Sequence, residues 1–432
     1  MTTLDTATNT TACDWLDAAQ ARAVQREFGT PSYLYDQRAL ESQAARGLAF
    51  PSAFGLTVRY AMKACPSAAV IRVLTGCGLQ IDASSGYEAR RALMAGVAGD
   101  QIQITAQELP QDLDELMALG VRLNACSLNQ LDRFGQLAPG GELSVRINPG
   151  LGSGHSQRTN VGGPSASFGI WHAYLDQVKA IAGRFGLRIT GLHSHIGSGS
   201  DPAVWQRCAR LTLDIAAQLP DVATVNLGGG FKVGRMPDEA STDLAAAGEP
   251  VAEEFAAFAR EHGRELRLEI EPGGFLVAQA GILVCTVMDV VDTGADGFSF
   301  VKIDSGMTEI LRPSLYGAQH PIAVVPLQAE AERGIAAYLV AGHCCESGDI
   351  LTPEPDNPEG LSPRTLTEAR IGDVVCIGGA GAYCAGMAAK NYNSFPEAQE
   401  VLRDRNDCFH LIRRRQQLDQ IVGNEVIPEF LG

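Results

Sequence analysis

The sequence is poor in basic residues and contains no long hydrophobic run. Its 432 residues include 34 lysines and arginines against 50 aspartates and glutamates, which leaves a net charge of −16. This excess of negative charge opposes binding to nucleic acid or to an anionic membrane surface. The apolar runs, such as IAAYLVA at 335–341, are far too short to span a bilayer. We therefore expect no nucleic acid and no membrane among its partners.

Targeting signals and disulfide patterns are also lacking. The first residues, MTTLDTATNTTACDW, contain neither a basic n-region nor an apolar h-region, and residues 1–12 have the composition of a disordered polar tail. The 11 cysteines are scattered without regular spacing and form no CxxC pair. These features predict a cytoplasmic protein whose thiols are mostly reduced.

What the sequence does contain is a regular alternation of strand and helix patterns between residues 58 and 271. Segments with helical spacing of apolar residues, such as SGYEARRALMAGV and LPQDLDELMALGV, separate the β-rich runs. Eight such runs end near Met62, Asp82, Ala106, Ala125, Asn148, His195, Asn226 and Glu271. Alternating strands and helices form a parallel sheet, and eight units can close into a (β/α)8 barrel. An open doubly wound sheet is the alternative.

The pattern changes after about residue 283, where β-rich runs follow one another with little helical spacing between them. We therefore predict an α/β protein with a parallel barrel at 37–282 and a mainly-β domain at 283–432. The β-rich run PSYLYD at 31–36 lies before the barrel and could join either domain. A chain of this length exceeds one ordinary core, which agrees with two domains.

Three local predictions follow from composition. NPGLGSGHSQRTNVGGPSASFG, at 148–169, is rich in glycine and serine and is predicted to form a loop over the strand ends. PEPDNPEGLSPR, at 353–364, has the proline, glycine and aspartate content of a loop. GAYCAGMAAKNY has helical spacing.

The chemically distinctive residues gather at the predicted ends of the barrel strands, where the active site of a parallel barrel lies. Lys63 ends the first strand, Asp82 ends the second, and NLGGGF and EPGG follow the last two. Glycines such as Gly228, Gly229 and Gly230 let backbone N–H groups approach a phosphate closely, although glycines also make ordinary tight turns. Ser198 could add a hydroxyl donor to such a cradle.

His193 and His195 alternate along one strand, so both could point the same way and suggest a metal site. Zinc requires at least one more protein ligand, and the sequence provides no clear third one. We therefore predict no metal. His193 is interpreted as a candidate structural histidine, and His195, nearer the strand end, as the better candidate for contacting a ring.

One cofactor, pyridoxal 5′-phosphate, explains a lysine, a phosphate cradle, an acidic residue and a ring-contacting histidine together. Its aldehyde requires a lysine amine, its phosphate requires the glycines, and its ring nitrogen requires an acidic partner. Lys63 and Glu271 fit the first and last of these roles. The alternative for Lys63 is an ordinary charged residue at the end of a strand.

The motifs YAMKAC, HSHIGSG, NLGGGF, IEPGG, CCESGD and GAYC together resemble those of the fold type III pyridoxal-phosphate decarboxylases. Within that family, IDSGMTEILRPSLYGAQHPI and NYNS resemble the diaminopimelate decarboxylases. The resemblance implies an alanine-racemase-like barrel, a C-terminal β domain with which the N-terminal segment 13–36 packs, and a homodimer whose active sites are shared between chains. It also implies decarboxylation of meso-diaminopimelate to L-lysine and carbon dioxide, a step of lysine biosynthesis.

The resemblance assigns roles by position. In the barrel it implies that Lys63 bonds the cofactor, that Glu271 contacts the ring nitrogen, that His195 stacks on the ring and that Asp82 supports it. Phosphate contacts are implied for Ser198, Gly228, Gly229, Gly230 and Tyr383. In the β domain it implies that Cys345 protonates the α-carbon, that Glu346 contacts the substrate amine, and that Arg312 and Tyr316 grip the distal carboxylate.

Three positions depart from the family pattern. Gly274 stands where the family has the arginine of EPGR, Ser167 stands where it often has lysine, and Cys65 replaces the asparagine of KAN. Because an arginine–carboxylate contact is strong and selective, its loss favours a different or larger distal group on the substrate. The alternatives are therefore decarboxylation of another basic or N-acylated amino acid, racemisation, and a regulatory homologue without activity.

Overall fold

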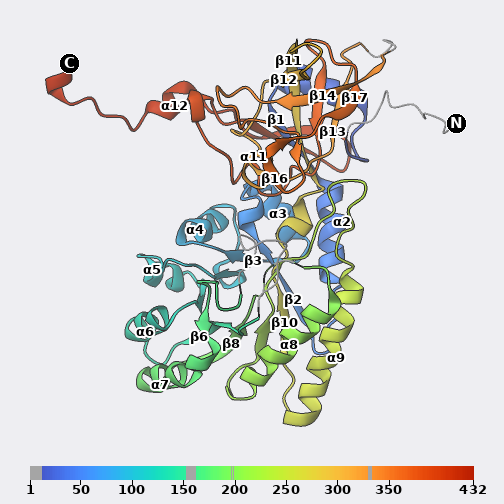
Figure 1. Cartoon of the computed structure of the whole chain (residues 1–432). Coiled ribbons are helices and arrows are strands. Elements are labelled where there is room, and N and C mark those ends of the chain that lie inside the picture. Colours follow the sequence, from blue (N-terminus) through green and yellow to red (C-terminus); the bar gives the residue numbers. More distant parts are fainter. Residues whose placement is uncertain (1–11, 152–161, 196, 198, 329–332) are drawn as a thin grey trace. The chain divides into compact units, whose positions relative to one another are not determined.

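Figure 1 shows the computed structural model of the chain, which describes residues 12–151, 162–195, 197, 199–328 and 333–432. The chain divides into two compact units. The barrel unit comprises residues 40–234 and 240–276, and the β unit comprises residues 1–39, 235–239 and 277–432. Residues 1–11 of the predicted tail, the middle of the predicted strand-end loop, and Ser198 lie outside the described residues.

The barrel unit contains the predicted closed parallel barrel. Its strands are β2 (Leu56–Ala61), β3 (Gln80–Ala83), β4 (Ile102–Ile104), β5 (Arg122–Ala125), β6 (Glu142–Asn148), β8 (Arg188–His193), β9 (Thr224–Asn226) and β10 (Arg267–Ile270). Each pairs in parallel with its neighbours, and the pairing of β10 with β2 closes the ring. The short strand β7 (Ile170–Trp171) adds to β6. This arrangement confirms the barrel and excludes the open sheet.

Helices connect the strands, as the apolar spacing predicts. They are α2 (Gln37–Leu48), α3 (Ala68–Gly76), α4 (Gly86–Met94), α5 (Leu113–Ala118), α6 (Leu128–Leu137), α7 (Leu175–Phe185), α8 (Pro202–Ala216), α9 (Leu244–His262) and α10 (Gly274–Val277), with 3-10 turns η2 (Met62–Ala64), η3 (Gly99–Gln101) and η5 (His172–Tyr174). Side chains define several starts: Ser85 accepts from the Glu88 N–H at α4, and Ser127 accepts from the Gln130 N–H at α6. Such caps satisfy backbone donors that the first helical turn leaves free.

The barrel interior contains a buried ion pair as well as apolar side chains. Arg59 of β2 donates from Nε and Nη2 to the two carboxylate oxygens of Glu269 on β10, both at 3.0 Å. The side chains are 1% and 7% exposed. A buried charge is tolerated only when it is paired, and this two-point contact holds the neighbouring strands β2 and β10 in register.

The β unit is built around one nine-stranded sheet. Its strands are β1 (Ser32–Asp36), β11 (Gly281–Asp292), β12 (Ser299–Ile303), β13 (Ile322–Val325), β14 (Ile335–Ala341), β17 (Arg364–Thr367), β18 (Val374–Ile377), β19 (Gln399–Arg403) and β20 (Phe409–Arg413). The N-terminal strand β1 lies between β11 and β19. Helix α1 (Ala18–Phe28) starts with a capping box at Asp17, and its apolar side chains join the core beneath this sheet.

Two local predictions in the β unit are wrong. The segment 353–364 is not a plain loop, because β15 (Pro353–Glu354) and β16 (Asn357–Leu361) pair across a turn with Asp356 at φ +60°. GAYCAGMAAKNY forms successive turns and no helix, with Tyr383 at φ +58°, a conformation that interrupts a right-handed helix. The remaining helical pieces are α11 (Arg312–Tyr316), α12 (Leu418–Val422), η6 (Tyr392–Ser394) and η7 (Glu429–Leu431). None of the described helices is long and apolar enough to cross a membrane.

Candidate active site

Lys63 lies in the 3-10 turn η2, directly after strand β2 of the barrel. Its neighbours anchor the turn, since Met62 and Ala64 are 0% and 1% exposed and the Tyr60 hydroxyl donates to the Cys65 carbonyl at 2.9 Å. The Lys63 side chain itself is exposed. A rigid turn therefore presents an accessible amine at the carboxyl end of the strand.

Glu271 follows strand β10 and is buried, but its carboxylate is held by two donors. Asn226 Nδ2 donates to Oε1 at 2.7 Å, and His193 Nε2 lies 3.0 Å from Oε2. Because a carboxylate only accepts, His193 must donate from Nε2. Burial by itself raises the pKa of Glu271, but the hydrogen bond from His193 and the charge of Lys63 outweigh it and lower the pKa below its ordinary value. Glu271 is therefore an anion at neutral pH.

Asp82, at the end of β3, behaves in the opposite way. Burial raises the pKa of its carboxyl group, the charge of Glu271 raises it further, and Lys63 lowers it only in part. Its Oδ1 atom is buried and has no hydrogen-bond partner in the part of the chain that the structure describes. Two neighbouring carboxyl groups whose pKa values are displaced in opposite directions are typical of an active site, because one stays ionised while the other can hold a proton.

The glycine turn after β9 is tied to Glu271 through Asn226. The Oδ1 atom of Asn226 accepts from the Gly228 N–H at 2.8 Å while its Nδ2 donates to Glu271, and the Glu271 N–H donates to the Gly228 carbonyl at 2.8 Å. One asparagine thus sets the position of both the turn and the carboxylate.

Only glycine fits this turn. A Cβ atom at Gly228, where φ is +73°, would lie 2.4 Å from Nδ1 of His195, and one at Gly229 would lie 2.1 Å from the Glu271 carbonyl oxygen. Gly230 has φ +98°. The glycines therefore allow His195 and the strand β10 to approach the turn, a packing role that stands beside any contact with a phosphate.

His195 is half-buried, and its Nδ1 atom is buried without a hydrogen-bond partner among the described residues. Desolvation, the charge of Arg146 and the charge of Lys63 lower its pKa well below the ordinary value, so the ring is neutral. A neutral imidazole can lie against an aromatic ring without bringing a second positive charge to it.

Sequence reasoning missed Arg146 and Asn226. Arg146 of β6 is 7% exposed, and its Nη2 atom is buried and has no hydrogen-bond partner within the described ranges. A charged residue inside the apolar strand LSVRIN is the signal that could have identified it, because unpaired charges are rarely buried without a function. For Asn226 the sequence contained no comparable signal.

The barrel unit brings together the residues of the predicted barrel site apart from Ser198, namely Lys63, Asp82, His195, Gly228, Gly229, Gly230 and Glu271, and adds His193, which was interpreted as structural. Gly274, one of the departures from the family pattern, begins α10. Ser167, another departure, accepts a hydrogen bond from Gln107 at 3.3 Å. No set of three histidine, cysteine, aspartate or glutamate side chains in the described ranges is placed to hold a metal ion.

In the β unit, the turn CCESGD is organised by Asp349. This buried carboxylate accepts from the Cys344 N–H at 2.9 Å and from the Met307 N–H at 2.6 Å. The two cysteines differ: Cys344 is buried, with a pKa raised to about 12 by desolvation and by Asp349, whereas Cys345 is exposed. The Cys345 N–H donates to Asn393 Oδ1 at 2.8 Å, which connects the turn to the NYNS segment.

The other predicted residues of the β unit are Glu346, Arg312, Tyr316 and Tyr383. Glu346 is exposed beside Cys345. The pKa of Tyr392 is raised, mainly by desolvation and next by the charge of Glu346. Arg312 opens α11, which ends at Tyr316. Burial is the main cause that lowers the pKa of Arg235 to about 10. The charge of Arg312 lowers this pKa further, and Tyr383 raises it.

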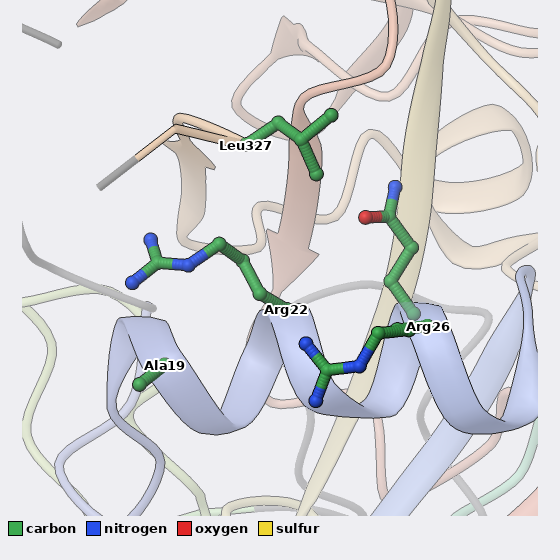
Figure 2. A pocket seen from close by; sticks show the side chains of 5 residues that line it. Ala19, Arg22, Arg26 and Leu327 are labelled. Atoms are coloured by element: carbon green, nitrogen blue, oxygen red, sulfur yellow. The ribbon is translucent and has the colours of Figure 1, made fainter. Parts of the chain in front are cut away.

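Figure 2 shows a separate hollow of the β unit, lined by Ala19, Arg22, Gln25, Arg26 and Leu327. Arg22 donates to the Pro326 carbonyl at 3.1 Å, and Gln25 donates to Thr286 and Gly372. None of the predicted site residues lines it, and its polar groups serve the packing of α1.

The barrel residues fit pyridoxal phosphate on structural grounds. Asp82 Oδ1, His195 Nδ1 and Arg146 Nη2 are buried polar atoms without a hydrogen-bond partner among the described residues, at the end of the barrel where Lys63 presents its amine. Buried polar atoms normally have partners, so this group is suited to a polar ligand.

Comparison with known proteins agrees with this chemistry. Residues 40–278 match the family described as "Pyridoxal-dependent decarboxylase, pyridoxal binding domain". The chain is 36% identical over 420 residues to a diaminopimelate decarboxylase of Streptomyces coelicolor, covering 96% of this chain and 93% of that protein. A crystal structure of diaminopimelate decarboxylase superposes with a TM-score of 0.87 at 34% identity, covering 94% and 96% of the two chains.

A crystal structure of diaminopimelate decarboxylase from Helicobacter pylori complexed with L-lysine is 26% identical, with a TM-score of 0.82 over 93% of this chain and 98% of that one. These matches extend over both units. The chain therefore belongs to the pyridoxal-dependent decarboxylase family that includes the diaminopimelate decarboxylases.

Proposed function

We propose that this chain converts meso-diaminopimelate to L-lysine and carbon dioxide with pyridoxal 5′-phosphate bound in the barrel unit. The observation that carries the proposal is the buried, ionised Glu271, which Asn226 and His193 hold within electrostatic reach of the exposed Lys63 amine. The substrate is supported by the diaminopimelate decarboxylases among the relatives and by the lysine complex of the Helicobacter enzyme, since lysine is the expected product.

The barrel residues divide the work of holding the cofactor. Lys63 bonds the aldehyde, Glu271 keeps the ring nitrogen protonated, and the neutral His195 lies on the ring. Asp82 supports the ring nearby, and Ser198 with the glycine turn at 228–230 receives the phosphate. When bound, pyridoxal phosphate delocalises the electron pair that remains on the α-carbon after carbon dioxide leaves.

The β-unit residues act on the substrate. Cys345 Sγ delivers the proton that replaces the lost carboxylate on the α-carbon, and Glu346 receives the substrate amine. Arg312 and Tyr316 bind the distal carboxylate, and Tyr383 contacts the phosphate. The exposure of Cys345 supports its part, because the buried Cys344, with its raised pKa, is enclosed by the Asp349 turn.

We also propose a homodimer with shared active sites, working in the cytoplasm without nucleic-acid or membrane partners. The net charge of −16 supports the lack of polyanionic partners. Buried thiols such as Cys208, Cys285 and Cys376 suit a reducing compartment.

The direct test is carbon dioxide release from a panel of amino acids by the purified holoenzyme. The panel contains meso-diaminopimelate, lysine, ornithine and N-acyl-ornithines. We expect diaminopimelate to give the highest kcat/KM, with lysine as its product. A higher kcat/KM for lysine, ornithine or an N-acyl-ornithine would identify that amino acid as the substrate instead. The absence of carbon dioxide release from every member of the panel would favour a regulatory homologue.

Mixing subunits tests whether the sites are shared. If Lys63 and Cys345 of one site come from different chains, each of Lys63→Ala and Cys345→Ala inactivates its homodimer. After the two variants are unfolded, combined equally and refolded, half of the dimers are heterodimers, and each heterodimer has one intact site. Activity should therefore return to about a quarter of the wild-type level, by counting sites.

Differential tags confirm that heterodimers have formed. Refolded wild-type protein provides the control for losses during refolding. Recovery no higher than that of the single variants, with tagged heterodimers present, would show that both residues of a site come from one chain.

Introducing arginine at residue 274 tests the departure from the family pattern. If the site serves diaminopimelate, Gly274→Arg is expected to keep or raise kcat/KM for that substrate, because a guanidinium suits a distal carboxylate. If the site serves a bulkier group, the same change should lower kcat/KM for it by about tenfold or more, equivalent to ~1.4 kcal/mol. Kinetics on both classes of substrate separate these cases, and unchanged kinetics on both would place residue 274 outside the substrate pocket.

A further inference from the structure

His343 precedes the turn CCESGD and is a residue to which neither the sequence motifs nor the proposed function assigns a role. Its side chain is 14% exposed. The backbone N–H of His343 donates to the Ser305 carbonyl at 3.0 Å, and its Nε2 atom lies 2.6 Å from the Thr308 hydroxyl oxygen. Backbone and side chain thus both attach the start of the turn to the segment 305–309.

The hydrogen bonds around Thr308 fix the protonation of the His343 ring. Thr308 donates its single hydroxyl proton to Glu309 Oε2 at 2.7 Å, so it accepts from His343, which must donate from Nε2. Desolvation lowers the pKa of His343 to about 4, so the ring is neutral and its Nδ1 carries no proton. Desolvation also raises the pKa of Glu309 to about 7, so this direction of donation holds above pH 7, where the Glu309 carboxylate only accepts.

On its flat side, the His343 ring stacks on Phe395. The ring centroids are 3.6 Å apart and the ring planes differ by 8°. Two residues further along the turn, the Cys345 N–H donates to Asn393 Oδ1 at 2.8 Å. His343 and Cys345 therefore contact Phe395 and Asn393, with a spacing of two residues on both segments. Two attachments at separate points fix the rotation of the turn as well as its distance from the segment 391–395.

The segment 391–395 requires such support, because its backbone is strained. Asn393 has φ +51° and Ser394 has φ +62°, values that residues other than glycine adopt rarely. Conformations of this kind persist where surrounding contacts enforce them, and they are concentrated at functional sites. Asn391 Nδ2 donates to the Phe395 carbonyl at 3.0 Å, and the stack with His343 adds a contact from a distant part of the chain.

We propose that His343 is a positioning residue for Cys345, which holds the CCESGD turn between the segments 305–309 and 391–395 and so fixes the place from which Cys345 Sγ delivers its proton. The inference rests on the proposed function, in which Cys345 protonates the α-carbon. Without the imidazole, the turn keeps the Cys345–Asn393 hydrogen bond and can pivot about it. Proton transfer is sensitive to such a movement, since a displacement of about 1 Å can cost on the order of a hundredfold in rate.

The first test is kinetics of the holoenzyme at pH 8, where Glu309 is mainly ionised. We expect His343→Leu to lower kcat for diaminopimelate by about tenfold or more, with KM and the affinity for pyridoxal phosphate near their wild-type values. His343→Gln keeps an N–H donor for Thr308, and His343→Phe keeps a ring for Phe395, so each should lose less. Asp349 still accepts from the Cys344 and Met307 N–H groups, so these variants are expected to fold, as melting temperatures will show.

The second test follows the delivered proton directly. In deuterated water the hydrogen that replaces the lost carboxylate is deuterium, and a donor held at one place adds it to one face of the carbon. We expect lysine from the wild-type enzyme to carry this deuterium in one configuration, and lysine from His343→Leu to contain a measurable share of the other. Nuclear magnetic resonance of the product distinguishes the two.

The third test does not depend on activity. The Cys345 N–H is protected from hydrogen exchange by its bond to Asn393, and loss of the stack should let this bond open more often. We expect exchange at Cys345 in His343→Leu to be about tenfold faster or more, as measured by mass spectrometry of the peptide that contains the turn. His262→Leu is the matched control, because His262 is an exposed residue of α9 that packs on Phe258 with ring centroids 4.5 Å apart.

The three measurements separate the possible outcomes. A folded His343→Leu variant with wild-type kcat and a single deuterium configuration would disprove the positioning role, and faster exchange at Cys345 in that variant would reduce His343 to a structural residue. If exchange at Cys345 becomes faster in His343→Leu but the wild-type enzyme does not decarboxylate diaminopimelate, the proposed function fails while the attachment of the Cys345 turn through His343 is supported.

Discussion

Replacing Lys63 with alanine is expected to lower decarboxylation at least about a thousandfold, which is within the range for loss of a group that takes part directly in proton transfer or covalent chemistry. The physical reason is the accessible amine, which a buried and hydrogen-bonded turn holds at the end of β2. The measurement is kcat for carbon dioxide release, with melting temperature to show that the variant is folded.

Chemical trapping identifies the same residue independently of activity. Borohydride treatment of the wild-type holoenzyme, followed by peptide mass spectrometry, should find the cofactor attached to Lys63. Lys179→Ala is the control, because Lys179 contacts Asp176 at 3.7 Å and Gln218 at 3.3 Å on the surface. Attachment at Lys302 or Lys390 would refute the assignment.

Replacing Glu271 with glutamine is expected to lower kcat by about a hundredfold, or ~2.7 kcal/mol of activation free energy. The amide keeps the shape and an oxygen acceptor for Asn226 Nδ2, but it removes the negative charge that the His193 hydrogen bond and the Lys63 charge stabilise by lowering the pKa of Glu271. A neutral side chain no longer keeps the cofactor ring nitrogen protonated. The effect should therefore be on kcat, with the cofactor still bound.

Glu254→Gln is a matched change elsewhere in the barrel unit. Glu254 accepts from Arg210 and Gln206 between α8 and α9, and we expect its replacement to leave kcat near the wild-type value. A Glu271→Gln variant that retains full kcat with bound cofactor would remove Glu271 from the ring-nitrogen role.

The order of strands and the position of the barrel site were predictable from the sequence because they depend on local chain properties. Short apolar runs separated by helical spacing identify parallel strands, and Lys63, Asp82 and Glu271 come at or directly after the ends of their strands. Strand ends of a closed parallel barrel lie at one edge, so residues far apart in the chain converge there. The family motifs then identified the cofactor.

Short-range conformation in the β unit was less predictable. The helical spacing of GAYCAGMAAKNY did not produce a helix. Asp356 and Tyr383 adopt positive φ values, which the pattern of residues in the sequence does not predict. Tertiary contacts override weak local propensity in such segments.

The sequence by itself determined the residue types at the strand ends, the glycines of the turn after β9, and the cofactor that suits them. Only the tertiary structure decided which of two similar groups is ionised, since Asp82 and Glu271 are both buried carboxyl groups and differ in their neighbours. It likewise distinguished the buried Cys344 from the exposed Cys345. The physical reason is that desolvation and Coulomb energies depend on distances in space, which neither periodicity nor spacing in the chain specifies.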